Sequence, residues 1–428
     1  MDILTTGCGL LALWAAIPAL DGVLRWRRLA APRGRARDAL GVRTPGKILA
    51  VIPARAEGAR VGDLASDLKR ESEREEEISS NEKRSVEVLV LLDGPDPNAA
   101  ARLDADGVSY LSKKTPGPAK GHALAFLAEQ LGDSLDAYDF ILVFDADMRL
   151  PGGFFRDLRV PEGAEVFQLP VRPAGNPAPG APRVEALSLA QAAKDDRARD
   201  AEGLPVRLRG KAMGFSPRAF RVGPAASTHT TVEDSEATLQ LAAAGIRVRA
   251  LEAPIAFDEP SAEAGAMARS RSRWFGGQLT LFFTGFGDLL RLAARNPKGA
   301  FVLACDLWLR PRILLLGTLA ILAVASDGVM LLFSSNGTWT AAARASGRPA
   351  PGASVLLLVL LLLLSFEAKA TLVCEWLSLA ALRRRIGYPA EVPPVSFSDV
   401  LSSCSMWIGA ALRGAAAPSR WHRARPPA

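Results

Sequence analysis

Long runs of apolar residues lie near both ends of the chain. The first extends from Ile3 to Leu24 and is interrupted by Asp21, the second extends from Ile313 to Phe333, and the third from Ala353 to about Leu372. About 20 apolar residues are enough to cross the hydrocarbon core of a bilayer. The pattern therefore predicts one membrane-spanning helix in the N-terminal part and about two in the C-terminal third.

Arginine clusters follow the first and third apolar runs. Six arginines lie between residues 25 and 37, and three more follow the third run at 383–385, whereas the connection 334–352 carries Arg344 and Arg348. Positive residues concentrate on the cytoplasmic side of membrane proteins. The sequence therefore predicts a multi-pass protein of the inner membrane with residues 25–310 and the C-terminal segment in the cytoplasm. This placement accounts for the net charge of +7 without a nucleic-acid partner.

Between these runs the apolar residues occur in short, β-branched segments that alternate with helical patterns. Lys47–Pro53, Val86–Leu92 and Phe140–Phe144 are typical of strands buried on both faces, and Gly62–Lys83 and Gly121–Leu131 are typical of helices. This alternation predicts an α/β fold with a doubly wound, mostly parallel sheet. Ligands of such folds bind outside the carboxyl ends of the strands.

Carboxylates follow two of the predicted strands. Asp93 ends the second, and Asp145 and Asp147 come directly after the third. Residues i and i+2 of an extended segment face the same way, so Asp145 and Asp147 can present two carboxylates to one point. Hard cations such as Mg²⁺ or Mn²⁺ bind one or two carboxylates together with substrate phosphates. We therefore expect a metal at Asp145 and Asp147.

Two further polar segments lie at predicted helix starts. Lys120 precedes the helix at 121–131, where a cation and free backbone N–H groups can face a diphosphate. Glu233 and Asp234 open a later helical pattern. Thr230 and Glu233 have the spacing of a capping box, which is a purely structural alternative for Glu233. Asp234 is a candidate general base, because three histidines and four cysteines without CxxC spacing offer little other acid–base or metal chemistry.

The segment from Arg269 to Phe275 is basic and aromatic. It precedes the Phe-rich stretch Leu279–Leu292, and together they are typical of an amphipathic helix at the membrane surface. Trp274 could also stack on a sugar ring, with arginines pairing with phosphate. Both interpretations remain open at this point.

The order of these segments resembles the family 2 glycosyltransferases, the membrane-bound GT-A group that includes the cellulose and hyaluronan synthases. The resemblance covers roughly residues 45–290 and implies an inverting transfer from a nucleotide-diphosphate sugar, usually a UDP-sugar, with Mg²⁺ or Mn²⁺. It places the base at Asp234 with Glu233 beside it, and the metal at Asp145 and Asp147. The resemblance implies these further contacts: donor binding by Pro53, Glu57, Asp93, Lys120, Asp145 and Asp147, and acceptor or diphosphate binding by Arg271, Arg273 and Trp274.

Two positions depart from the family pattern. Ser270 stands where Gln is usual, and Ala56 where Asn is usual. With few spans for a polymer channel, we expect a single sugar transfer to a lipid or growing glycan at the cytoplasmic membrane face, with possible partners in an envelope glycan pathway. A nucleotidyltransferase on a similar fold and a catalytically inactive membrane scaffold are the alternatives.

The predicted division of the chain follows from these patterns. It comprises an N-terminal anchor (1–24), a basic linker (25–44), a GT-A catalytic domain (45–277), an amphipathic interfacial segment (278–312), two membrane helices with an external connection at 334–352 (313–382), and a cytoplasmic C-terminal segment (383–428).

Overall fold

The chain forms two compact units in the computed structural model. One consists of Met1–Pro32 and Leu309–Tyr388, and the other of Arg33–Trp308 and Pro389–Ala428. The residues that the structure describes are 3–30, 41–78, 84–258, 264–309, 312–335, 351–386 and 395–416. Each unit is described separately below.

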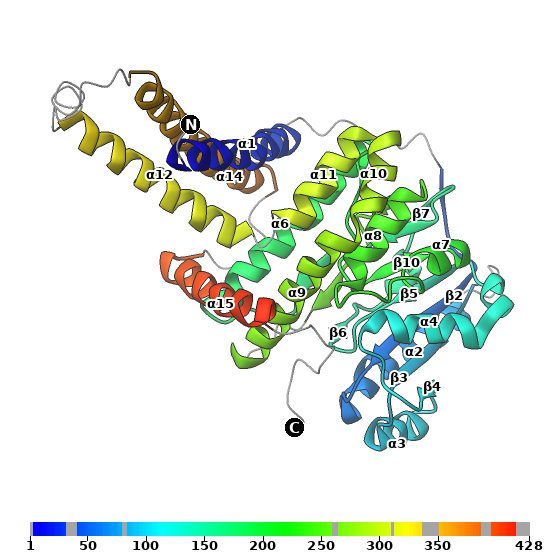
Figure 1. Cartoon of the computed structure of the whole chain (residues 1–428). Helices are drawn as coiled ribbons and strands as arrows, with labels where there is room; N and C mark the ends of the chain where they lie inside the picture. Colours follow the sequence, from blue (N-terminus) through cyan, green and yellow to red (C-terminus); the bar gives the residue numbers. More distant parts are fainter. Residues whose placement is uncertain are drawn as a thin grey trace. The chain divides into compact units, whose positions relative to one another are not determined.

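A seven-stranded sheet forms the centre of the larger unit (Figure 1), with strand order β11-β8-β10-β5-β2-β3-β4. The strands β5, β2, β3 and β4 are parallel, β10 is antiparallel to both of its neighbours, and β11 is parallel to β8. The bounds are β2 Lys47–Ala54, β3 Ser85–Asp93, β4 Ser109–Lys113, β5 Phe140–Val143, β8 Val166–Gln168, β10 Met213–Phe215 and β11 Val248–Ala250. The three strands expected from the sequence are present, and the predicted α/β class is confirmed.

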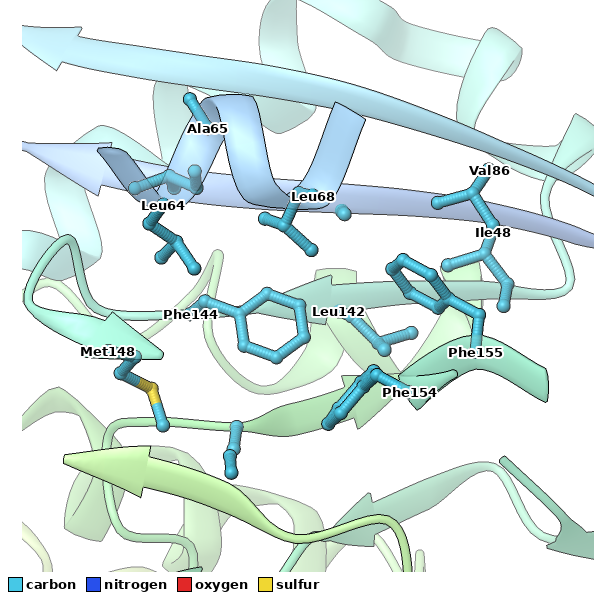
Figure 2. Packing of buried hydrophobic residues seen from close by; sticks show 14 of the residues in the cluster. Ile48, Leu64, Ala65, Leu68, Val86, Leu142, Phe144, Met148, Phe154 and Phe155 are labelled. Carbon is cyan, nitrogen blue, oxygen red and sulfur yellow. The ribbon is translucent and has the colours of Figure 1, made fainter. Parts of the chain in front are cut away.

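Helices cover both faces of this sheet, because its strands bury side chains on both sides. In β2, Ile48 and Ile52 belong to one apolar core, whereas Leu49 and Val51 belong to the other. The first core contains residues of α2 (Val61–Ile78) and α3 (Pro97–Ala105), and the second contains residues of α4 (Lys120–Leu131), α7 (Pro217–Val222) and α8 (Glu233–Ala243). Figure 2 shows Leu68 of α2 and the rings of Phe144, Phe154 and Phe155 in the first core. The expected helix at 121–131 is α4. The expected helix at 62–83 is α2 as far as Ile78, and residues 79–83 lie outside the described residues.

Shorter elements complete the fold around the sheet. A three-stranded sheet has the order β6-β12-β9, and β1 pairs with β7. The bounds of these elements are β1 Val42–Arg43, η1 Gly58–Arg60, η2 Gly132–Ala137, β6 Met148–Arg149, α5 Phe154–Asp157, β7 Val160–Pro161, β9 Val171–Pro173 and β12 Ala256–Asp258. The pairing of Asp258 with Met148 brings the end of β12 next to the segment that follows β5.

Five further helices belong to the larger unit: α6 Ala181–Ala201, α9 Ala264–Thr284, α10 Phe286–Arg295, α11 Pro297–Trp308 and α15 Phe397–Ala416. Arg199 of α6 is only 1% exposed and is paired with Asp195, at 2.8 Å, and with Asp306 of α11. The helix α15 packs along α9, and a Cβ placed on Gly414 would lie 2.4 Å from the Ser272 carbonyl oxygen. The C-terminal helix is therefore an integral part of the larger unit.

The smaller unit contains α1 (Ile3–Ala30), α12 (Arg312–Ser335) and α14 (Pro351–Ile386). By length and composition, two described segments, Thr6–Ala30 and Arg312–Leu331, could cross a membrane. The third expected span lies within α14, and residues 336–350 of the connection lie outside the described residues. Ion pairs join the three helices: Arg312 pairs with Asp21 at 2.6 Å, and Arg25 pairs with Glu375 at 2.9 Å.

Candidate active site

The strands β2, β3 and β5 run parallel, so their carboxyl ends place the predicted donor residues along one edge of the sheet. Pro53 is buried within β2, and Glu57 precedes the short helix η1. The Asp93 carboxylate has no exposed surface and accepts a hydrogen bond from the Gly117 backbone N–H at 3.0 Å. Arg55 and Lys113 lie 3.7 and 3.5 Å from its oxygens. Asp93 therefore fixes the loop before α4 at the donor edge.

Lys120 links the segment after β5 to the start of α8. Its Nζ donates to Asp145 Oδ1 and to the Gly210 carbonyl oxygen, each at 2.6 Å, and lies 3.9 Å from Glu233 Oε1. Burial alone would lower the pKa of Lys120, but Asp145 and Glu233 raise it above its ordinary value. Burial would raise the pKa of Asp145, and Lys120 and Lys211 lower it. Lys120 is thus a charged lysine that connects two of the predicted motifs.

The acidic pair Glu233 and Asp234 lies in the first turn of α8. The capping-box alternative for Glu233 is wrong: Val232 is the N-cap, and Glu236, not Glu233, accepts from Thr230 N and Oγ1 at 3.0 Å. Burial and the Asp234 carboxylate raise the pKa of Glu233 to about 7, against the opposing effect of Lys120.

The three residues predicted on α9 have different surroundings. Arg271 is buried, pairs with Glu185 of α6, and stacks on Trp274 at 4.4 Å and on Trp407 of α15 at 5.0 Å. Arg273 feels the carboxylates of the acidic site, but burial outweighs their effect and lowers its pKa. The structure therefore brings Arg273 to the acidic site, whereas the described partners of Arg271 tie α9 to α6 and α15.

Three residues of this region were not anticipated from the sequence. Lys211 lies in the loop before β10, and its Nζ forms an ion pair with Asp258 Oδ2 at 2.6 Å. Its charge also interacts with Asp147 and Asp145. Asp258 at the end of β12 is the second of these residues, and Trp407 of α15 is the third. A lysine after Gly210 in a loop next to a short strand is the only local signal for Lys211, and it is a weak one.

The donor set at Asp145 and Asp147 fits a hard divalent ion that is also held by a substrate. Among the described residues, no group of three or more His, Cys, Asp or Glu side chains is arranged to hold a metal ion. The expected extended segment is wrong: Asp145 to Met148 form a turn, in which the Met148 N–H donates to the Asp145 carbonyl oxygen at 3.1 Å. Two carboxylates after a buried strand still correspond to the pattern in which substrate phosphates supply the remaining ligands. The residues present therefore fit such an ion together with a phosphate ligand.

Parallel strands whose carboxyl ends gather carboxylates and lysines define an α/β enzyme with a polar ligand site at that edge. Residues 140–379 match the model of the glycosyl transferase family group 2, which is more than half of the 428 residues. The chain therefore belongs to this family and is a glycosyltransferase. The match does not single out the cellulose and hyaluronan synthase group within it.

Solved structures with a similar fold are also glycosyl-transferring enzymes. The mannosyltransferase PcManGT from Pyrobaculum calidifontis, solved with GDP-Man and Mn²⁺, is 13% identical, with a TM-score of 0.48 over 87% of this chain and 99% of that chain. Glucosyl-3-phosphoglycerate synthase from Mycobacterium tuberculosis, solved with Mn²⁺, UDP and glucosyl-3-phosphoglycerate, is 19% identical, with a TM-score of 0.34 over 54% of this chain and 77% of that chain. No curated protein matches the sequence.

Proposed function

We propose that the protein transfers one sugar, with inversion, from a nucleotide-diphosphate sugar to a lipid or growing glycan acceptor at the cytoplasmic face of the membrane. The observation that carries this proposal is the Lys120 link, which holds Asp145 and the start of α8 at one site. A donor-binding carboxylate and a candidate base must lie together for a direct displacement at the sugar carbon.

The donor lies along the edge formed by β2, β3 and β5 in this proposal. Pro53, Glu57 and Asp93 lie at the nucleoside end, and Lys120 lies near the diphosphate. Asp145 and Asp147 would hold Mg²⁺ or Mn²⁺ together with the donor phosphates. When bound, such an ion offsets the negative charge that develops on the departing diphosphate.

Asp234 is the proposed base for the acceptor hydroxyl. The pKa of Glu233, raised to about 7, is near the range of a general base at neutral pH, so Glu233 is the second candidate base of the adjacent pair. Arg273 faces these carboxylates and can pair with phosphate, while Trp274 offers an aromatic surface to a sugar. Arg271 supports both residues by fixing α9 against Glu185.

The membrane location rests on apolar helices and flanking arginines. Two described helical segments are long and apolar enough to span a bilayer, and six arginines follow the first of the apolar runs. A UDP-sugar donor and a lipid acceptor on the cytoplasmic side agree with this arrangement, because nucleotide sugars are water-soluble and the arginines mark the cytoplasmic side.

The direct test uses the full chain in detergent or nanodiscs with Mn²⁺ and a panel of nucleotide sugars. Asp147→Ala and Asp234→Asn are expected to reduce sugar transfer at least 100-fold, whereas the exposed Asp157→Asn is a matched control that retains it. Equal transfer by all variants would contradict the assignment of these residues. Release of pyrophosphate instead of a nucleoside diphosphate would identify nucleotidyl transfer.

A further inference from the structure

Lys211 faces the predicted metal-binding carboxylates from the loop before β10. Its ammonium group lies 2.6 Å from Asp258 Oδ2, and Asp258 pairs across the small sheet with Met148, the residue after Asp147. Burial alone would lower the pKa of Lys211, but Asp258, Asp147 and Asp145 together raise it above its ordinary value. The ion pair with Asp258 therefore holds Lys211 beside the segment 145–147.

The loop is built to hold this lysine in place. Gln168 Nε2 donates to the Lys211 carbonyl oxygen at 2.9 Å, and Gln168 Oε1 accepts from the Arg209 backbone N–H at the same distance. The Gly210 carbonyl oxygen accepts from Lys120, so the loop is tied directly to the partner of Asp145. Ala212 has a φ of 52°, a left-handed conformation that is uncommon for a residue with a Cβ and that clusters at functional sites.

Lys120 and Lys211 differ in what they can offer to a ligand. An ammonium group has three N–H donors. Lys120, with 8% of its side chain exposed, directs two donors at Asp145 and Gly210 and also lies close to Glu233. Among the described residues, Asp258 is the one hydrogen-bond partner of Lys211 Nζ, and this side chain is 16% exposed. Lys211 therefore retains two donors, on a side chain that is twice as exposed as that of Lys120.

We propose that Lys211 binds the diphosphate of the nucleotide donor directly, as a fixed positive charge next to the carboxylates that would hold the divalent ion. This inference rests on the proposed function, because it assumes a nucleotide-diphosphate ligand at this edge. Asp258 and Gln168 act as positioning residues, the first by pairing with the ammonium group and the second by holding its backbone. If Lys211 contacts phosphate directly, its replacement should weaken the binding of nucleoside diphosphates and leave the binding of nucleosides unchanged.

The experiment measures the binding of UDP, GDP, uridine and guanosine to the full chain, with Mn²⁺ and with EDTA. Lys211→Met is expected to weaken binding of the nucleoside diphosphate about 10- to 100-fold in both conditions, the range for one charged hydrogen bond, and to leave binding of the matching nucleoside unchanged. Lys211→Arg, which keeps the charge, is expected to remain within a few-fold of the wild type. The exposed Lys298→Met serves as the matched control for loss of a lysine.

The possible outcomes distinguish failure of the proposed donor class from failure of the proposed role of Lys211. Wild-type protein that binds neither UDP nor GDP would overturn the proposed donor class, and this inference with it. Wild-type binding of a nucleoside diphosphate that Lys211→Met retains would overturn only the role of Lys211. Equal losses of nucleotide and nucleoside affinity in Lys211→Met would show that the lysine is structural, and would also overturn the inference.

Discussion

Gly121→Ala is expected to disturb the acidic site, because Gly121 directly follows Lys120 and a Cβ on it would lie 3.5 Å from the Glu233 Cβ. Gly121 is the second residue of α4, and a Cβ there would lie 1.7 Å from the Ser227 carbonyl oxygen and 2.8 Å from its carbon. Both obstructing atoms belong to the backbone, so no side-chain rotation relieves the clash. Ordinary contact needs at least 3.4 Å, so the loop at Ser227 must move by more than an ångström.

The magnitude follows from two opposing effects. Because the obstructing atoms are backbone, overpacking should cost the upper part of its usual range, about 2–3 kcal/mol; alanine regains about 1 kcal/mol of helix propensity, which leaves a net loss of about 1–2 kcal/mol. In a unit of this size that lowers Tm by roughly 2–8 °C. The same loop leads into Glu233 and Asp234, and an ångström of displacement can cost about 100-fold in transfer rate.

The assay compares Tm and the rate of sugar transfer for Gly121→Ala and for Gly287→Ala. Gly287 lies in α10, and a Cβ there would meet no atom within 4 Å, so this control should equal or exceed the wild type in stability. If Gly121→Ala keeps both the Tm and the rate of the wild type, the close packing of the Ser227 loop on α4 is refuted.

Three other perturbations test separate parts of the larger unit. Arg199→Met should lower the free energy of unfolding by about 3–5 kcal/mol, because it removes the buried cation that pairs with two buried aspartates. Arg218→Met breaks an exposed pair and should cost at most about 1 kcal/mol; equal costs in denaturant titration would contradict this. Trp407→Ala should release α15 and raise the susceptibility of the C-terminal segment to proteolysis, while the exposed Phe397→Ala on the same helix should not. The pKa of Glu233 is raised from 4.5 to about 7 on folding, so protonated Glu233 stabilises the metal-free protein by up to about 3 kcal/mol. This contribution is complete below pH 4.5 and is lost as the pH rises through 7. Glu233→Gln should remove this part of the pH profile of Tm.

The sequence predicts three of the four strands in the parallel half of the sheet, because β2, β3 and β5 carry largely buried apolar runs, whereas β4 is partly exposed and has no such run. The strands β2 and β3 have 8 and 9 residues, enough for an apolar run to stand out, and the chemistry at their ends follows from the parallel arrangement. Asp93 and Asp145 were found for this reason. The position of a residue at a strand end is a local property, and local patterns predict it.

The rest of the site depends on contacts between distant segments. The strands β8 to β12 have three residues each, too few for a periodic pattern, so neither Asp258 nor its pairing with Met148 has a sequence signal. Lys211 meets Asp258 across 47 residues of sequence. Trp407 lies beyond the matched family region and reaches Arg271 only because α15 returns to α9.

The charge balance of the site explains why donor and metal binding should depend on each other. The cluster of charges around Lys120 and Lys211 has five carboxylates and three cations, an excess of two negative charges when all are ionised: Asp145, Asp147, Glu233, Asp234 and Asp258 against Lys120, Lys211 and Arg273. A diphosphate alone would add to this excess, and Lys211 could offset only part of it. A divalent ion matches the excess, so its binding would lower the cost of bringing the diphosphate to the carboxylates. Burial is the main cause of the raised pKa of Glu233, and repulsion from Asp234 adds to it; the pKa should fall when a cation enters the site.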